Sequence, residues 1–238
     1  MGSEMCIRDR VYTHRLRELM GIEGHDVAAI MKALQLDVGF VHGYMDVAYR
    51  IDSPEYGEFW LLHCGALIDV EPLGEDRVVN MCHTIEDPTF DATALATNPR
   101  ARIRPIHRPP RVPADRHPHC HWTLKIDDAN EPIGPMVHTD RVAALPLASV
   151  PNAVGPDRDG GELHDYRGGF EPDFRLRRLT SGALAAVTRE FQIQSHLLCA
   201  SDHLTVADRA GESVARATSD EGWRTFAWLV AGLSLIHI

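Results

Sequence analysis

The stretch YMDVAYRIDSPEYGEFWLLHC, at positions 44–64, decides which fold we expect. In its first half apolar residues alternate with polar or small ones, which is typical of a strand with one buried face. The DSPEYG segment at 52–57 is typical of a turn, and residues 58–64 return as a second strand. We therefore predict a β-hairpin. Its first strand buries Met45, Val47, Tyr49 and Ile51, and in its second strand Trp60, Leu62 and Cys64 share a face.

Two further strands are predicted downstream, over residues 101–106 and 118–126. In the second of these, Cys120, Trp122, Leu124 and Ile126 fall on one face and His119, His121, Thr123 and Lys125 on the other. Alternation of this kind indicates a sheet that is covered on one side only.

Helical patterns surround these strands. Asp26 is placed to cap a helix in which Val27, Ile30, Met31 and Leu34 recur at helical spacing. A second helix is predicted over residues 74–98, interrupted near Asp87 and Pro88, where Asp87 would cap the restart. A long helix is expected from about 179 to 208, with one or two more after it. The fold class is therefore α+β: an antiparallel sheet of about four strands covered by helices, followed by a helical segment.

The two ends of the chain do not follow these patterns. A single DNA segment, translated on opposite strands, would encode both MCIRD at 5–9 and LSLIH at 233–237, and it matches a transposon end used to prepare sequencing libraries. We therefore expect residues 1–10 and 233–238 to be library scars on a metagenomic fragment. Between them we predict an α+β domain at 11–127, a loop-rich linker at 128–172 and a helical segment at 173–232 that is truncated.

Composition limits the possible functions. The net charge of −10 argues against a general nucleic-acid binder, which would carry a basic face. No apolar run approaches the roughly 18 residues that span a bilayer, so no membrane partner is expected. Without Cys6, four widely spaced cysteines remain, and so few thiols in a chain of this length predict reduced cysteines and a cytoplasmic location. The oligomeric state is left open, and a homo-oligomer is compatible with the sequence.

The cysteines carry the main functional hypothesis. Cys64 and Cys120 are both expected to point to the apolar side of the sheet, and Cys82 lies on the helix predicted to cover that side. Three buried thiols acting as small hydrophobic residues are one interpretation. In a second, Cys82 is a nucleophile, with His83 beside it and Glu86 and Asp87 within a turn. In a third, Cys64, Cys82, Cys120 and His119 bind zinc.

Two other features carry candidate residues. The stretch RARIRPIHRPPRVPADRH at 100–117 is strongly basic within an acidic chain. Arg102, Arg104 or Arg108 could hold the carboxylate of a small anionic substrate, with His107 nearby, or the stretch could be a solvated loop. On the long helix, a stripe at helical spacing suggests a metal face, a pocket wall or the edge of a helix interface. It consists of Gln192, His196, Cys199 and His203.

The order of these motifs resembles the L-2-amino-thiazoline-4-carboxylic acid hydrolase family. LLHCGALIDVE at 61–71, MCHTIED at 81–87 and HPHCHWTLKI at 117–126 stand where that family has a strand ending in Cys, a helix with Cys followed by Asp, and a late strand with Cys before an aromatic residue. The resemblance covers about residues 14–127. The Gly-Asp pair that the family usually carries before its last Cys is replaced here by PADRHPHC.

The resemblance implies hydrolytic opening of a cyclic amidine that bears a carboxylate. We therefore expect a hydrolase of carbon–nitrogen bonds with no cofactor, or with zinc in the alternative. The expected catalytic residues are Cys82, His83 and Asp87. The expected substrate-binding residues are Arg102, Arg104, His107, Cys64 and Cys120. The competing hypothesis is a non-catalytic module that binds or senses a small molecule or a metal.

Overall fold

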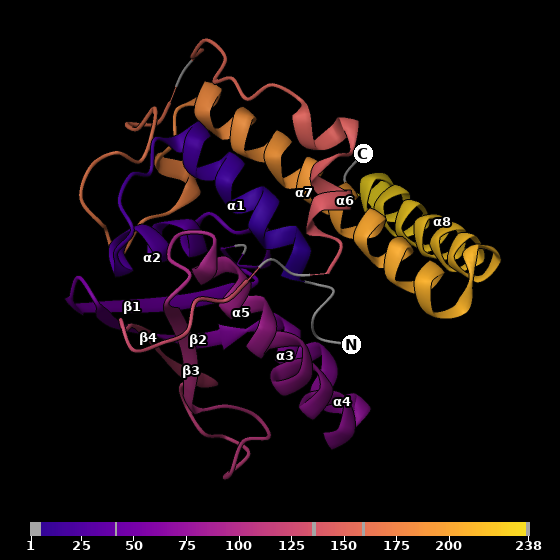
Figure 1. The fold of residues 1–238 in the computed structure, drawn as a ribbon, viewed down its shortest axis with the longest axis horizontal. Coiled ribbons are helices and arrows are strands. Elements are labelled where there is room, and N and C mark those ends of the chain that lie inside the picture. The colour runs from indigo at the N-terminus through magenta and orange to yellow at the C-terminus, as the bar shows by residue number, and fades with distance from the viewer. Residues whose placement is uncertain (1–5, 41, 135–136, 159, 237–238) are drawn as a thin grey trace.

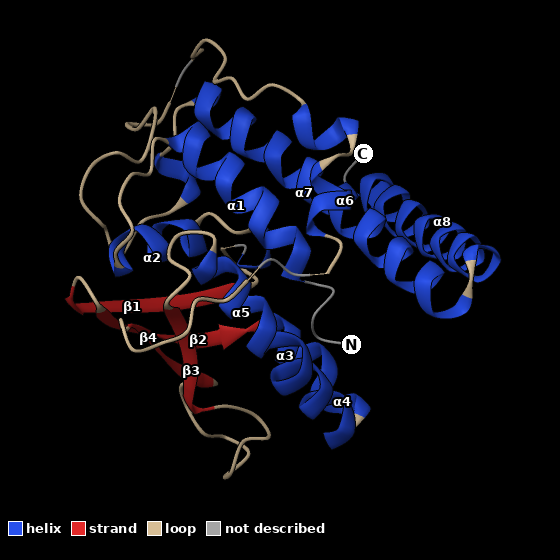
Figure 2. Ribbon diagram, in the orientation of Figure 1, coloured by secondary structure: helices blue, strands red, loops and turns tan. Residues whose placement is uncertain are grey.

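The computed structural model of the 238-residue chain describes residues 6–40, 42–134, 137–158 and 160–236, with the backbone alone for 6–10 and 225–236. The outermost residues of both predicted scars lie outside these ranges. Residues 6–10 belong to the first helix and residues 233–236 to the last. Figures 1 and 2 show a β-sheet covered on one face by helices, with a helical layer beyond them.

In the described part of the chain, four strands form one antiparallel sheet in the order β1-β2-β4-β3. They are β1 (Met45–Ser53), β2 (Tyr56–Cys64), β3 (Ala101–His107) and β4 (Cys120–Ile126). The predicted hairpin is β1 and β2, joined by a tight turn at Pro54 and Glu55. The prediction of an α+β fold with a four-stranded antiparallel sheet is therefore confirmed.

The faces of β2 differ from those that simple alternation predicts. Phe59 and Leu61 are buried, whereas Leu62 is 47% exposed. The pairing of β1 with β2 shifts between Asp46 opposite His63 and Val47 opposite Leu61, so Leu62 is an extra residue in β2. Such a bulge reverses the facing of the residues beyond it. Cys64 therefore reaches the core together with Phe59 and Leu61, and the prediction that it shares a face with Trp60 and Leu62 is wrong.

The main core lies between the sheet and the helices α2 (Val27–Gln35) and α5 (Glu86–Leu95). Asp26 caps α2 by accepting a hydrogen bond from the Ala29 backbone N–H at 2.9 Å, as predicted. Stacked and edge-on aromatic contacts join the layers, with Phe59 parallel to Trp122 and Phe90 edge-on to both. The predicted inner face of β4 is confirmed, since Trp122 and Leu124 are fully buried.

The segment between β2 and β3 is helical almost throughout. It contains α3 (Gly65–Val70), α4 (Glu75–Val79), a π-helical turn (Asn80–Ile85) and α5. The predicted interruption near Asp87 and Pro88 is wrong, and Asp87 does not cap a new helix, because the chain enters α5 directly from the π turn. Pro88 has no backbone N–H, so it cannot donate a hydrogen bond to a carbonyl of the preceding π turn.

A second core joins the first helix to residues 163–191. Here α1 (Cys6–Met20) packs against α7 (Ser181–Ala210), while Tyr166 and Phe174 from the preceding segment are stacked with ring centroids 4.5 Å apart. The short helix α6 (Thr139–Ala143) precedes this layer, and α8 (Glu212–Ile236) follows it. The domain boundaries at 127 and 173 remain predictions, but the linker and helical segments share this core with α1.

Candidate functional site

Three thiols lie in the main core, each from a different element. Cys64 ends β2, Cys82 lies in the π-helical turn and Cys120 begins β4, and the three residues are 3%, 2% and 4% exposed. All belong to the same buried cluster. The Cys64 sulfur also accepts a hydrogen bond from the Leu67 backbone N–H at 3.4 Å and so caps α3. We call Cys64, Cys82 and Cys120 the thiol cluster.

Burial determines the protonation of the thiol cluster. It raises the pKa of Cys64 to about 11 and raises the pKa values of Cys82 and Cys120 further above the usual range. For Cys82, negative charge on Glu86 and on the other two thiols adds to this effect. The three sulfurs therefore lie close enough to interact electrostatically, and all three are thiols rather than thiolates at neutral pH.

Glu86 is the acidic group of the thiol cluster. It follows Cys82 by four residues, which places both side chains on the same side of the helical segment. The residue is only partly covered, but its Oε2 atom is buried and has no hydrogen-bond partner. Burial raises the pKa of Glu86 to about 8, against the opposing effect of Arg108. Glu86 is therefore largely a neutral carboxylic acid at pH 7.

Arg108 supplies the positive charge beside this carboxyl group. It comes from the loop after β3, and its guanidinium lies 5.9 Å from the centre of the Trp122 ring, within the range of a cation–π contact. It forms an ion pair with Asp87 and is itself mostly buried. The positive charge of Arg108 also acts to lower the pKa values of Glu86 and Cys82, against the effect of burial. The basic stretch thus contributes one arginine to the site.

His83 and Asp87, the two predicted acid–base partners of Cys82, contact other groups. The Nε2–H of His83 donates to the backbone carbonyl of Pro109 at 2.7 Å, so this ring holds the loop that carries Arg108. Asp87 pairs with Arg108. Both residues support the position of Arg108, and their catalytic roles remain predictions.

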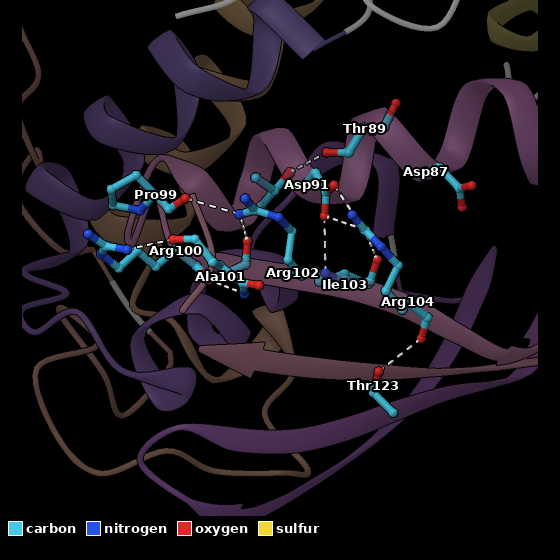
Figure 3. Close-up of polar contacts among 12 residues, drawn as sticks. Asp87, Thr89, Asp91, Pro99, Arg100, Ala101, Arg102, Ile103, Arg104 and Thr123 are labelled. Carbon is cyan, nitrogen blue, oxygen red and sulfur yellow. Dashed lines mark hydrogen bonds and ion pairs between the residues drawn. The ribbon is translucent and has the colours of Figure 1, made fainter. Parts of the chain in front are cut away.

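Arg102 and Arg104, the predicted anion-binding residues, already have internal partners, as Figure 3 shows. Arg104 contacts both carboxylate oxygens of Asp91 at 2.8 Å, and Asp91 also accepts from the backbone N–H of Ile103. Arg102 donates to the backbone carbonyls of Pro99, Ala101 and Glu131. These contacts tie the edge strand β3 to α5 and to the loop that follows β4.

The contacts described for the two remaining predicted histidines, His107 and His119, are with groups other than Cys82. The Nδ1 of His119 accepts a hydrogen bond from the Cys64 backbone N–H at 3.1 Å, and burial together with Arg111 lowers the pKa of His119. His107 lies near His121, with ring centroids 6.2 Å apart, and burial lowers its pKa as well. Both imidazoles are therefore neutral at pH 7.

The zinc hypothesis depends on whether these groups converge. Across the described residues, no group of three or more His, Cys, Asp or Glu side chains is arranged to hold a metal ion. The imidazole of His119 is oriented by the backbone of Cys64 through its Nδ1 atom. The geometry therefore gives no support to zinc bound by Cys64, Cys82, Cys120 and His119.

Comparison with known proteins adds no identification. No protein-family model, curated protein or solved structure matches the chain. The resemblance to the L-2-amino-thiazoline-4-carboxylic acid hydrolase family accordingly stays a prediction. Within the residues that the structure describes, no helix is both long and apolar enough to cross a membrane.

Glu86 is the residue that the sequence reasoning left out of the site. Its spacing of four from Cys82 was the available signal, because residues four apart on a helix are neighbours. Asp87 is selected from the sequence instead, because the family that the chain resembles carries an Asp after the Cys of this helix. The π-helical turn, a feature that often marks functional sites, has no clear signature in the sequence.

The accessibility of the thiols leads to a direct prediction. Under native conditions at pH 7.5, a thiol reagent should modify Cys199 first among the described cysteines, because Cys199 is partly exposed and the other three are buried. Peptide mass spectrometry with and without denaturant would measure the order, with the denatured chain as the control for intrinsic reactivity. Rapid native modification of Cys64, Cys82 or Cys120 would show that the thiol cluster is open to solvent.

Proposed function

We propose that the chain is a hydrolase that cleaves a carbon–nitrogen bond of a small carboxylated substrate, with Cys82 as nucleophile and Glu86 as the proton-transfer group. The observation that carries this proposal is the buried Glu86 Oε2, which has no hydrogen-bond partner and belongs to a carboxyl group coupled to all three thiols. Burying a carboxyl oxygen without a hydrogen-bond partner is costly, and strongly shifted pKa values concentrate at functional sites.

The proposed chemistry follows from the protonation states. Because Cys82 is a neutral thiol, its proton must leave as the sulfur attacks the substrate carbon, and the ionised form of Glu86 accepts it. Glu86 then protonates the nitrogen as the carbon–nitrogen bond breaks. Water attacks the resulting thioester or thioimidate, passing its proton to Glu86, which returns a proton to the departing Cys82 sulfur. One carboxyl group thus serves as base and acid in turn.

Substrate recognition in this proposal falls mainly to Arg108. A guanidinium group can hold a carboxylate through two parallel hydrogen bonds, and Arg108 already pairs with the carboxylate of Asp87. A substrate carboxylate would compete for this guanidinium beside the thiol cluster, with Cys64 and Cys120 as the apolar wall. Arg102 and Arg104 are tied to internal oxygens, so they serve as comparison positions. The cysteines whose side chains are described are all free, which fits the reducing cytoplasm in which we place this activity.

The alternative is a binding module that breaks no bond. The raised pKa values of the three thiols favour it, because thiols of this kind are also found as inert core residues. The two functions differ in one respect that can be measured. A binding module would retain the ligand unchanged, whereas the hydrolase would turn it over.

Replacing Cys82 by Ala tests the nucleophile. Hydrolysis should be followed with 2-amino-thiazoline-4-carboxylate and a panel of carboxylated amides and cyclic amidines. For any substrate that the parent turns over, Cys82→Ala should lower kcat by about 1,000-fold or more, because the variant lacks the sulfur that forms the covalent intermediate. Cys199→Ser is the matched control and should keep the parental rate. A fully active Cys82→Ala variant would end the proposal, and binding without turnover by the parent would support the alternative.

A further inference from the structure

A separate cavity of about 900 Å³ lies between α7 and α8, outside the thiol cluster. One wall contains the stripe noted in the sequence, and the other comes from the first half of α8. The α7 wall is formed by Gln192, Ser195, His196, Cys199, Asp202, His203 and Val206, and the α8 wall by Thr218, Ser219, Gly222 and Trp223. This volume lies within the range of small-molecule sites. The stripe therefore serves as a pocket wall.

Two aromatic rings, one from each helix, contact each other in the lining of this pocket. His196 on α7 and Trp223 on α8 are stacked, with ring centroids 4.9 Å apart and planes inclined by 25°. Trp223 is 37% exposed. Aromatic surfaces of this kind bind flat rings by offset stacking or edge contacts. The geometry favours a planar aromatic ligand over a flexible aliphatic one.

Polar contacts connect the two helices at the pocket wall. The Nδ1 atom of His203 lies 3.0 Å from the Ser219 hydroxyl, and its Nε2 atom lies 3.4 Å from a carboxylate oxygen of Glu212. His203 therefore has partners on α8 at both ring nitrogens. Such contacts hold α7 and α8 at a defined separation, so the pocket is built into the helix pair rather than opened by a ligand.

The charge of the lining determines the kind of ligand. Among the described lining residues there is no Lys or Arg, and the formally charged side chain is Asp202. Burial and the charge of Asp202 raise the pKa of Cys199, which keeps this thiol neutral. An anion would find no cation in this lining to neutralise it. A neutral or positively charged ring would be accepted, since a cation is attracted both to a carboxylate and to the face of a Trp ring.

Gly222 adds an independent observation. It lies inside α8, where glycine weakens a helix relative to alanine. A Cβ atom built at Gly222 would meet no described atom within 4 Å, so packing does not require glycine at this position. The glycine leaves this part of the pocket wall without a side chain.

We propose that the pocket between α7 and α8 is a binding site for a flat, nitrogen-containing aromatic molecule that is neutral or positively charged. This site is distinct from the thiol cluster, whose proposed substrate is an anion. The two sites therefore take ligands of opposite charge preference. Neither the proposed hydrolysis nor the family resemblance is needed for this inference.

Isothermal titration of the full chain with 2-aminobenzimidazole tests the proposal, with benzimidazole-2-carboxylate as the probe of matched shape and opposite charge. We expect saturable 1:1 binding of the amine with a Kd of about 0.1–1 mM and at least about tenfold weaker binding of the carboxylate. Bound amine should also slow the modification of Cys199 by a thiol reagent, because this thiol lines the pocket.

Three variants locate the binding. Trp223→Leu removes the stacking surface and Gly222→Phe fills the cavity, so each should raise the Kd of the amine at least about tenfold. Gly222→Ala is the matched control and should bind like the parent, since its methyl group enters open space. Circular dichroism checks that each variant is folded. Absence of saturation up to several millimolar, equal binding of both probes, or unchanged affinity in Trp223→Leu would overturn the proposal.

Discussion

Replacing Glu86 by Gln should strongly slow hydrolysis and at the same time stabilise the protein at pH 8. Loss of the proton-transfer group should lower kcat by about 100- to 10,000-fold, the usual contribution of general acid–base catalysis. In the parent, kcat/KM should rise about tenfold per pH unit below pH 8 and then level off, because the ionised form of Glu86 is the base and its pKa is about 8. A glutamine side chain does not ionise in this range, so this pH dependence should be absent from any residual rate.

The stability effect follows from the same pKa. In the folded chain the pKa of Glu86 is raised from 4.5 to about 8, so between these values the folded state keeps a proton that the unfolded state has lost. The free energy of unfolding of the parent should therefore fall as the pH rises from 5 to 8. The size of the loss is on the order of 4 kcal/mol as an upper estimate. The amide introduced by Glu86→Gln stays neutral at every pH, so the variant avoids this loss.

Urea unfolding of both proteins at pH 5 and pH 8 would measure this difference. Parent and variant should have similar stability at pH 5, and the variant should be more stable at pH 8. Glu75→Gln is the control for a general change of charge, because Glu75 is an exposed carboxylate near the start of α4, and it should follow the parent at both pH values. If the difference between Glu86→Gln and the parent does not change with pH, Glu86 is not held as a buried neutral acid.

Replacing Glu190 by Ala should destabilise the chain by about 3–5 kcal/mol. Glu190 on α7 is fully buried, and both of its oxygens accept hydrogen bonds from Arg15 on α1 at 2.8 Å. The same guanidinium donates to the backbone carbonyls of Ala148 and Val150, also at 2.8 Å. Removing Glu190 leaves a largely buried charge without its counter-ion, which is why the cost is far larger than for a surface pair.

The double variant Arg15→Met with Glu190→Leu separates the pair from the packing around it. Because it removes both charges, it should recover much of the stability lost in Glu190→Ala. Arg216→Ala removes an exposed ion pair with Glu212 and should cost less than about 0.5 kcal/mol. Urea denaturation at pH 7 gives all three values. A cost for Glu190→Ala as small as that of Arg216→Ala would mean that the contact between α1 and α7 contributes little.

Local patterns of the sequence were sufficient to predict the strands and the main helices. Alternation predicted the hairpin and the inner face of β4, and the spacing of four apolar residues predicted the buried side of α2, with Asp26 as its cap. These predictions succeed because they depend on neighbours within a turn of helix or along one strand. The stripe at His196, Cys199 and His203 was likewise visible, although its role as a pocket wall depends on α8.

Tertiary structure decided which charged groups belong to the site. Arg104 and Arg108 differ little in sequence context, yet one pairs with Asp91 at the edge of the sheet and the other stacks over Trp122 beside Cys82. Glu86 and Asp87 are adjacent, and only Glu86 has a buried oxygen without a hydrogen-bond partner. A pKa depends on burial and on charges brought close by folding, and neither is encoded in nearby residues.

The sequence alone determined the sheet, the main helices and the burial of Cys120 and Cys82, because periodicity is a local property of the chain. Only the tertiary structure decided how Cys64 reaches the same core and that Glu86 is the acidic residue beside the thiol cluster. One extra residue at Leu62 reverses the facing of the end of β2, and a π-helical turn carries the chain into α5 without a break. Both depend on how the segments pair and pack with distant parts of the chain.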